Sequence, residues 1–186
     1  MKKIAFILLT TAIFLFTAFS YGQATVYKAD TDYGNKNFRA YVSVEHVKNG
    51  LWVKSKDESL DRINLAKDKY WGYRNSWGES YRFKNAKKAL RIIEFGAICV
   101  YENKPIIAAT SNPDIVPNWE DNPYGLSKNH SFSIGSNGKI ITFSKNKFLK
   151  ALETIPSAYT QFQKYFESNS NDILVKIMEY NVAVES

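Results

Sequence analysis

The sequence predicts an α+β protein, with antiparallel β-hairpins over most of the mature chain followed by about three C-terminal helices. Three observations lead to this prediction. Apolar and polar residues alternate in short runs before residue 144, which is typical of half-buried strands. Glycine-containing turns separate several of these runs. After residue 144 the apolar residues recur at helical spacing, and helices that follow a set of strands cover one face or edge of the sheet.

The chain begins with the pattern of a signal peptide. Two lysines precede the apolar run 4–19, which is shorter than the roughly 20 residues of a membrane-spanning helix. Ser20 and Gly22 place small residues at positions −3 and −1 of a cleavage site after Gly22. Cleavage after Ser20 and an uncleaved membrane anchor are the alternatives. We therefore expect residues 1–22 to be removed, and the protein to be periplasmic or extracellular with no membrane span after cleavage.

The remaining residues, 23–186, suit a single α+β domain with a β-rich part over 23–143 and a helical part over 144–186. The full chain has 25 Lys and Arg against 18 Asp and Glu, and aromatic residues make up 15% of it, which argues against disorder. The basic excess could favour anionic partners or serve only solubility. Because the lysines are scattered and the chain is predicted to be exported, we expect no nucleic-acid partner.

The first strands are predicted from alternation and turn chemistry. Residues 38–44 are predicted to form one strand, whose even-numbered residues, Phe38, Ala40, Val42 and Val44, share a face. Asn49-Gly50 predicts a tight hairpin with both residues at the centre of the turn. We expect a polar loop over 54–68, with at most a short strand at 62–65.

The later strands form two groups. Residues 70–74 and 80–83 are predicted to form a hairpin around a polar turn, and strands at 90–95 and 97–101 extend it into an antiparallel meander. A last hairpin is predicted to pair 131–134 with 139–143 through Gly135-Ser136-Asn137-Gly138. Prolines among Asn, Asp and Ser over 110–129 predict a long loop.

Three helices are predicted after the last hairpin. Ser144 is the expected N-cap of the first, and Pro156 is expected to end it. Ser157 is expected to cap the second helix, and Asn171 the third. Their apolar stripes are expected to be Phe148, Leu149, Leu152 and Ile155, then Tyr159, Phe162 and Phe166, then Leu174, Ile177 and Met178 with Asn181.

No pattern in the sequence assigns a catalytic residue, a metal site or a cofactor. The only histidines are His46, expected to be exposed or half-buried on the side of its strand opposite Val44, and His130; neither has metal-ligand spacing. The nucleophile-elbow pattern is absent, although the members of a Ser-His-Asp triad need not be near in sequence. Cys99, the only cysteine, is expected to be buried and inert, so the fold has no intramolecular disulfide.

Three carboxylates share the proline-rich loop: Asp114, Glu120 and Asp121. Carboxylates that converge on a loop could bind Ca²⁺ or act as an acid/base pair in glycoside hydrolysis. Their spacing matches no calcium loop, and a solvated polar loop is the simpler interpretation.

Aromatic residues give the best candidates for binding. Trp71 and Tyr73 are expected to share one face, as are Tyr81 and Phe83, and cross-strand aromatic pairs of this kind commonly form a core. Trp77 differs because it lies in a turn beside Gly78, and Trp119 lies in the proline-rich loop. We interpret Trp77 and Trp119 as surface residues that bind a protein or a glycan.

Two longer sequence patterns resemble those of other proteins. They are Trp71-Gly72-Tyr73-Arg74 … Gly78 … Tyr81-Arg82-Phe83, and Phe132-Ser133-x-Gly135-x-x-Gly138-Lys139-Ile140 followed by helices. The chain from about Asp68 onward resembles small exported bacterial proteins of unknown function. The resemblance implies export and fold, and it implies no activity, cofactor or catalytic residue.

These observations leave three functional hypotheses. The first is a non-catalytic binding or interaction protein of the cell envelope, with an envelope protein or a glycan as partner. The second is a periplasmic inhibitor or immunity-type protein. The third is a glycan-acting hydrolase that uses the loop carboxylates. The lack of a catalytic pattern favours the first.

Overall fold

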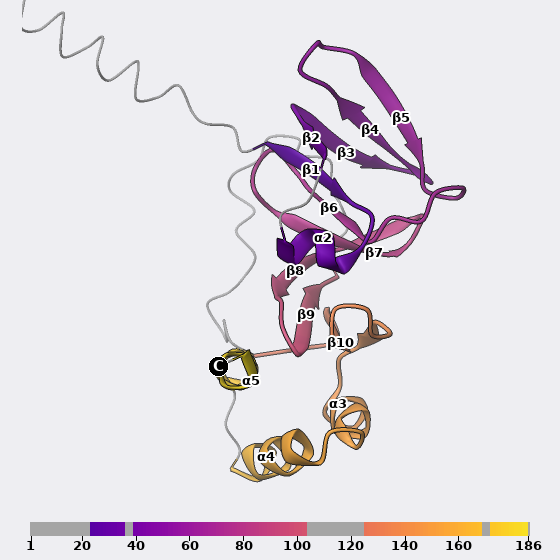
Figure 1. Ribbon diagram of the computed structural model, residues 1–186. Helices are drawn as coiled ribbons and strands as arrows, with labels where there is room; N and C mark the ends of the chain where they lie inside the picture. The colour runs from indigo at the N-terminus through magenta and orange to yellow at the C-terminus, as the bar shows by residue number, and fades with distance from the viewer. Residues whose placement is uncertain (1–22, 36–38, 104–124, 169–171, 186) are drawn as a thin grey trace, which may run out of the picture.

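The computed structural model describes residues 23–35, 39–103, 125–168 and 172–185. In these ranges the chain forms two antiparallel sheets and four helices, and three of the helices follow the last strand. The three-stranded sheet and helices α3 to α5 lie at opposite ends of the molecule, with the eight-stranded sheet between them (Figure 1). The prediction of an α+β fold with a β-rich N-terminal part is confirmed.

The eight-stranded sheet contains both hairpin groups that the sequence predicts. Its strands lie in the order β11 (Ile141–Thr142), β10 (His130–Ile134), β9 (Ile98–Glu102), β8 (Lys88–Glu94), β7 (Ser80–Asn85), β6 (Gly72–Arg74), β1 (Ala24–Tyr27) and β2 (Arg39–Tyr41). Strands β6 to β9 form the predicted meander, and β10 and β11 form the last hairpin. A short helix, α2 (Asp30–Asn35), follows β1.

The predicted strand over 38–44 is wrong, because the chain changes sheets within it. Strand β2 ends at Tyr41, and β3 (Ser43–Val47) begins the three-stranded sheet. Between them, the Val42 N–H donates to the carbonyl oxygen of Lys54 at 2.7 Å. The alternation restarts at this change, so Tyr41 and Val44 are buried while Val42 is 48% exposed. Phe38 lies outside the described residues.

The second sheet consists of β3, β4 (Gly50–Lys54) and β5 (Leu60–Asn64). The predicted hairpin is present, but its turn is Lys48-Asn49, and Gly50 is already paired with Val47. Asn49 has a φ of 61°, and a Cβ added to Gly50 would lie 2.9 Å from the Ile63 carbonyl oxygen of β5. Glycine is therefore needed there for close strand approach. Strand β5 begins two residues earlier than predicted and pairs along β4.

Two apolar cores lie on the same face of the eight-stranded sheet. Cross-strand partners point to the same face of a sheet, and so do residues two apart on one strand. Tyr81 pairs with Arg91, Arg91 pairs with Glu102, and Val100 lies two residues before Glu102. These four residues therefore share one face, which we call the first face. At one end the three-stranded sheet covers this face, with Val44, Leu51 and Val53 packed against Tyr73 and Ala89. At the other end the helices cover it, with Phe148, Leu152, Phe162 and Ile177 packed against Ile98, Val100 and Phe132.

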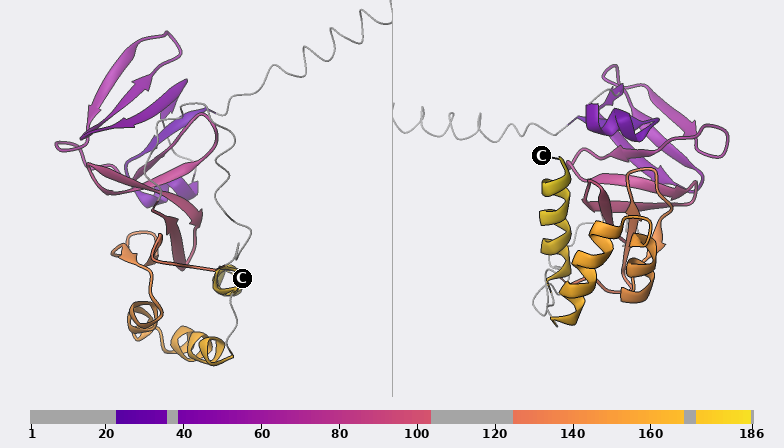
Figure 2. Two further views of the ribbon diagram at one scale, coloured as in Figure 1. Left: turned by 180° about the vertical axis from the view of Figure 1, so that it is seen from behind. Right: turned by 60° about the horizontal axis from the view of Figure 1, so that its bottom comes forward.

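The helices are α3 (Lys145–Leu152), α4 (Pro156–Glu167) and α5 (Ile173–Glu185), seen end-on and side-on in Figure 2. The Ser144 Oγ accepts from the Lys147 N–H, which confirms that N-cap. Pro156 begins α4 rather than ending α3, and Ile155 occupies the N-cap, so the assignment of Ser157 as a cap is wrong. The physical reason is that the first turn of a helix does not need the N–H that proline lacks.

Helix α5 is attached to the sheet through Asn181. Its Oδ1 accepts from the Ile98 N–H, and its Nδ2 donates to the Ile98 carbonyl oxygen, both at 2.9 Å. A Cβ on Gly96 would lie 2.6 Å from the Asn181 Cγ, so the contact requires glycine. Leu174 and Ile177 are buried as predicted, whereas Met178 is 45% exposed. Asn171 lies outside the described residues. No helix in the described ranges has the length and apolar character to cross a membrane.

The second face of the eight-stranded sheet holds a smaller cluster of Leu90, Cys99 and Tyr101. Cys99 is fully buried, as predicted, and burial raises the pKa of its thiol. The turn after β10 closes over this face: the Trp71 Nε1–H donates to the Ser136 carbonyl oxygen at 3.1 Å, and the Ser136 hydroxyl donates to the Asp30 carboxylate of α2.

Candidate binding site

The turn between β6 and β7 carries the most exposed aromatic side chain of the described residues. Trp77 is 68% exposed, whereas the other exposed tryptophan in those ranges, Trp52 on β4, is 36% exposed. An indole held in solvent forgoes the stabilisation that burial of its large apolar surface would give. Trp77 was predicted to be a surface residue, and its exposure agrees with that prediction.

The backbone of this turn is held by the side chain of Asn75. Its Oδ1 accepts from the N–H groups of Trp77 and Glu79, both at 3.0 Å. Short polar side chains that bond to the backbone two residues on are the usual means of holding such turns. Gly78 has a φ of 83°, a conformation that glycine adopts without steric cost. The turn therefore presents Trp77 from a fixed backbone.

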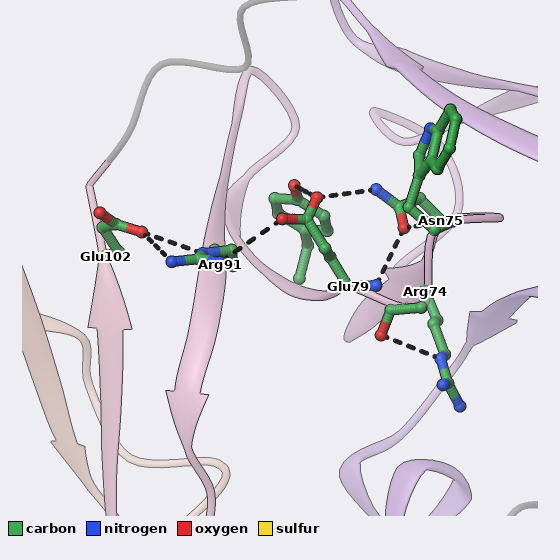
Figure 3. A network of polar contacts seen from close by, with 8 residues as sticks. Arg74, Asn75, Glu79, Arg91 and Glu102 are labelled. Carbon is green, nitrogen blue, oxygen red and sulfur yellow. Dashed lines mark hydrogen bonds and ion pairs between the residues drawn. The ribbon is translucent and has the colours of Figure 1, made fainter. Parts of the chain in front are cut away.

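The side chain of Asn75 is itself held by Glu79. Its Oε2 accepts from the Asn75 Nδ2 at 3.0 Å and from the Tyr81 hydroxyl at 2.7 Å, and the other oxygen lies 3.4 Å from an Arg91 nitrogen (Figure 3). Partial burial raises the pKa of the Glu79 carboxyl, but the bonds from Tyr81 and Asn75 and the charge of Arg91 outweigh it. The pKa is thereby held below its usual range. Glu79 is consequently ionised at neutral pH and accepts all three bonds.

A partly buried ion pair forms the inner end of this network. Arg91 directs both Nε, at 2.9 Å, and a terminal nitrogen, at 2.6 Å, to one oxygen of Glu102. The Glu102 side chain is only 9% exposed, and charge-assisted bonds of this kind are among the strongest in proteins. Arg91 and Glu102 lie on the first face of the sheet. A continuous polar chain therefore runs from Glu102 through Arg91, Glu79 and Asn75 to the backbone of Trp77.

Arg74 lies at the other side of the turn. Its Nε donates to the Gly78 carbonyl oxygen at 3.1 Å, and its side chain is directed away from the Glu79–Arg91–Glu102 chain (Figure 3). The ion pairs of the described residues do not include Arg74. One of its terminal nitrogens lies beside Gly78, the residue that follows Trp77.

Glu79, His46 and His130 are each engaged in local contacts. A general acid needs a carboxyl with a raised pKa, whereas the pKa of Glu79 is lowered. Burial lowers the pKa of both His46 and His130, so both are neutral at pH 7. Each ring is used locally: His46 Nε2 lies 3.3 Å from the Ala86 carbonyl oxygen, and His130 Nδ1 accepts from the Ser127 N–H. Among the residues described, no three His, Cys, Asp or Glu side chains gather as metal ligands would.

Two details of the aromatic and histidine predictions are corrected. His46 is half-buried but lies on the same side of β3 as Val44, because its ring packs 6.2 Å from that of Tyr73. Trp71 and Tyr73 do not share a face: Tyr73 stacks on Tyr81 at 4.9 Å, whereas Trp71 packs beside Phe95 at 6.0 Å. Strand β6 begins at Gly72, so Trp71 precedes it and does not follow its alternation.

The other predicted site residues cannot be placed. Trp119, Asp114, Glu120 and Asp121 lie outside the described residues. The residues that support Trp77 were not predicted from the sequence: Arg74, Asn75, Glu79, Arg91 and Glu102. Two signals could have found some of them. Asn75 precedes Trp77-Gly78-Glu79 at the spacing of a side-chain-held turn. Arg91 is a charge within the apolar run 89–93, and Glu102 is a charge at the end of the apolar run 97–101.

Comparison of the chain with protein-family models, with curated proteins and with solved structures finds no match. The candidate site therefore depends on its own geometry.

Proposed function

We propose that this chain is an exported, non-catalytic binding protein of the cell envelope, and that the turn carrying Trp77 is its contact surface. One observation supports the contact surface above all: a 68%-exposed indole stands on a turn whose backbone is held from within by Asn75 and Glu79. Rigid presentation reduces the entropy lost on binding, and tryptophan is among the residues that contribute most to binding energy.

Export is proposed from the N-terminal pattern of two lysines, an apolar run and small residues. N-terminal sequencing of the protein recovered from its own cells tests this part. A chain that begins near residue 23 would support it, and an intact Met1 would contradict it.

The binding role is tested by crosslinked pull-down of the tagged protein from its native cell envelope, followed by mass spectrometry and glycan analysis. We expect Trp77→Ala to lose the captured partner while its melting temperature stays close to that of the unsubstituted protein. Trp52→Ala is the matched control, because it removes another exposed tryptophan from a different sheet. Equal capture by all three proteins would refute the assigned contact surface.

A further inference from the structure

We propose that the outer face of the three-stranded sheet binds a second copy of this chain, with the two copies related by a two-fold axis along β4. This contact is independent of the proposed function and uses a different surface from the Trp77 turn. Its centre is a row of three exposed side chains, one from each strand, with opposite charges at its two ends.

The outer face is the side of the three-stranded sheet that is turned away from the eight-stranded sheet. Leu51 and Val53 of β4 are buried in the core between the sheets, so Trp52 between them points outward and is 36% exposed. Its cross-strand partners, Glu45 of β3 and Arg62 of β5, share the outer side and are both exposed. The row across the sheet is therefore a carboxylate, an indole and a guanidinium, at the end of the molecule away from the helices α3 to α5 (Figure 1).

The side chain of Arg62 lies across β4 beside the indole. Its guanidinium carbon is 5.8 Å from the centre of the Trp52 ring, and its Nε is 3.2 Å from the position that a Cβ on Gly50 would occupy. The missing side chain of Gly50 thus leaves room for the arginine on the outer face. The ion pairs of the described residues include neither Arg62 nor Glu45, so both charges can serve a contact with another molecule.

A row of this kind is complementary to itself. A two-fold axis along β4 exchanges the two sides of the face, so it brings Glu45 of each copy opposite Arg62 of the other, and Trp52 opposite Trp52. Two-fold contacts in which the same patch is used by both copies are the commonest in homo-oligomers. An axis across the strands would instead place Glu45 opposite Glu45, and like charges disfavour an interface. The charges therefore favour a second copy in one orientation.

The neighbouring residues of the outer face do not oppose this pairing. Lys54 follows Trp52 on the same side of β4, but its ammonium nitrogen lies 3.9 Å from the Glu58 carboxylate of its own chain, which compensates its charge. Leu60, the partner of Lys54 on β5, is 62% exposed and adds apolar surface. Tryptophan and arginine are enriched at the centres of protein interfaces, where they contribute much of the binding energy.

The size of the face sets the expected strength of the contact. Three strands of five residues cover about 15 Å by about 17 Å in plan. An interface of standard size buries roughly 800 Å² on each partner, and this face is much smaller. We therefore expect a reversible dimer with a Kd on the order of tens of micromolar.

Analytical ultracentrifugation of the protein recovered from its own cells tests the contact, and we expect a monomer–dimer equilibrium. Trp52→Ala should weaken dimerisation about tenfold. Glu45→Arg and Arg62→Glu should each weaken it by at least about tenfold, because like charges then face each other. An equal mixture of these two variants should associate again, because a row with two basic ends then faces a row with two acidic ends.

The matched controls are Lys67→Glu, which changes the net charge as Arg62→Glu does but lies in the turn after β5, and Trp77→Ala, which removes an exposed indole elsewhere. Both should dimerise like the unsubstituted protein, and thermal unfolding checks that every variant is folded. A protein that stays monomeric at every concentration would overturn the inference. So would folded Glu45→Arg and Arg62→Glu variants that do not associate when mixed. A dimer that forms although no Trp77-dependent partner is captured would support the inference and count against the proposed function alone.

Discussion

Two arginines on neighbouring strands occupy opposite environments. Arg82 of β7 is 8% exposed on the second face of the eight-stranded sheet. It donates to the Tyr101 hydroxyl at 2.6 Å, the Ser133 hydroxyl at 3.0 Å and the Gly138 carbonyl oxygen at 2.8 Å. The ion pairs of the described residues do not include it. Arg91 of β8 lies instead on the first face, between the carboxylates of Glu79 and Glu102.

This difference in environment indicates that Arg82 has a structural role, whereas Arg91 helps to present the Trp77 turn. Arg82 joins β7, β9, β10 and the turn after β10 through neutral oxygens, and its guanidinium lies 5.7 Å from the ring of Trp71. Arg91 joins the sheet to Glu79, which holds the turn that presents Trp77. We therefore expect substitution of Arg82 to act mainly on global stability, and substitution of Arg91 to act on stability and on the turn.

The largest effect is expected for Arg82→Ala. It removes the donor from two buried oxygens and one partly buried oxygen and creates a cavity, and we expect a loss of about 3 kcal/mol in the free energy of unfolding. Arg82→Met restores most of the volume, so it should recover about 1 kcal/mol of that loss. Urea unfolding measures both. A loss below about 1 kcal/mol for Arg82→Ala would show that these oxygens find other partners.

Arg91→Ala is expected to lower the free energy of unfolding by about 2 kcal/mol, because it removes the guanidinium that lies 2.6 Å from the largely buried Glu102 carboxylate. The double substitution Arg91→Leu with Glu102→Leu should be less damaging than the sum of the single ones, since no uncompensated charge remains. A double-mutant cycle measures this coupling. Strictly additive losses would argue that the pair contributes nothing specific.

Asn75→Ala is expected to cost about 1 kcal/mol, because two N–H groups of the turn lose their acceptor. Its more informative effect should be on Trp77, whose indole should become more mobile and bind its partner less tightly. Fluorescence anisotropy decay in a variant that keeps Trp77 as the reporting tryptophan measures the mobility. Ser76→Ala, in the same turn, serves as the control and should leave both properties unchanged.

The smallest effect concerns pH. The pKa of Glu79 is lower in the folded protein than its ordinary value of 4.5, so the unfolded chain takes up the proton first as the pH falls. The stabilisation from Glu79 is therefore fully present above pH 4.5 and is lost as the pH falls through the folded pKa. Glu79→Gln should flatten the acid side of the stability curve. Identical acid slopes in both proteins would contradict the assignment.

Local sequence patterns predicted much of the fold, because many of its elements depend only on residues close together in the sequence. The meander from β6 to β9, the last hairpin and the Ser144 cap each follow from alternation, glycine turns or a capping side chain. The same reasoning failed at Val42, where the chain moves from one sheet to the other. It failed again at Trp71, which precedes β6 and does not share the face of Tyr73.

The candidate site likewise has one feature that local patterns predict and others that they miss. Exposure of Trp77 could be predicted because it lies in a turn beside glycine. Arg91 and Glu102, which support the turn from within the sheet, lie on β8 and β9, and their contacts depend on strand register that no local pattern specifies.

The sequence by itself determined the fold class, the burial of Cys99 and the position of Trp77 in a turn, since these follow from periodicity, residue type and turn chemistry. Only the tertiary structure decided that Arg82 and Arg91 face opposite sides of one sheet, and that a chain of charges from Glu102 holds the turn of Trp77. The reason is that each such contact joins strands distant in sequence, and a shift of one residue in their pairing would reverse the face of every side chain.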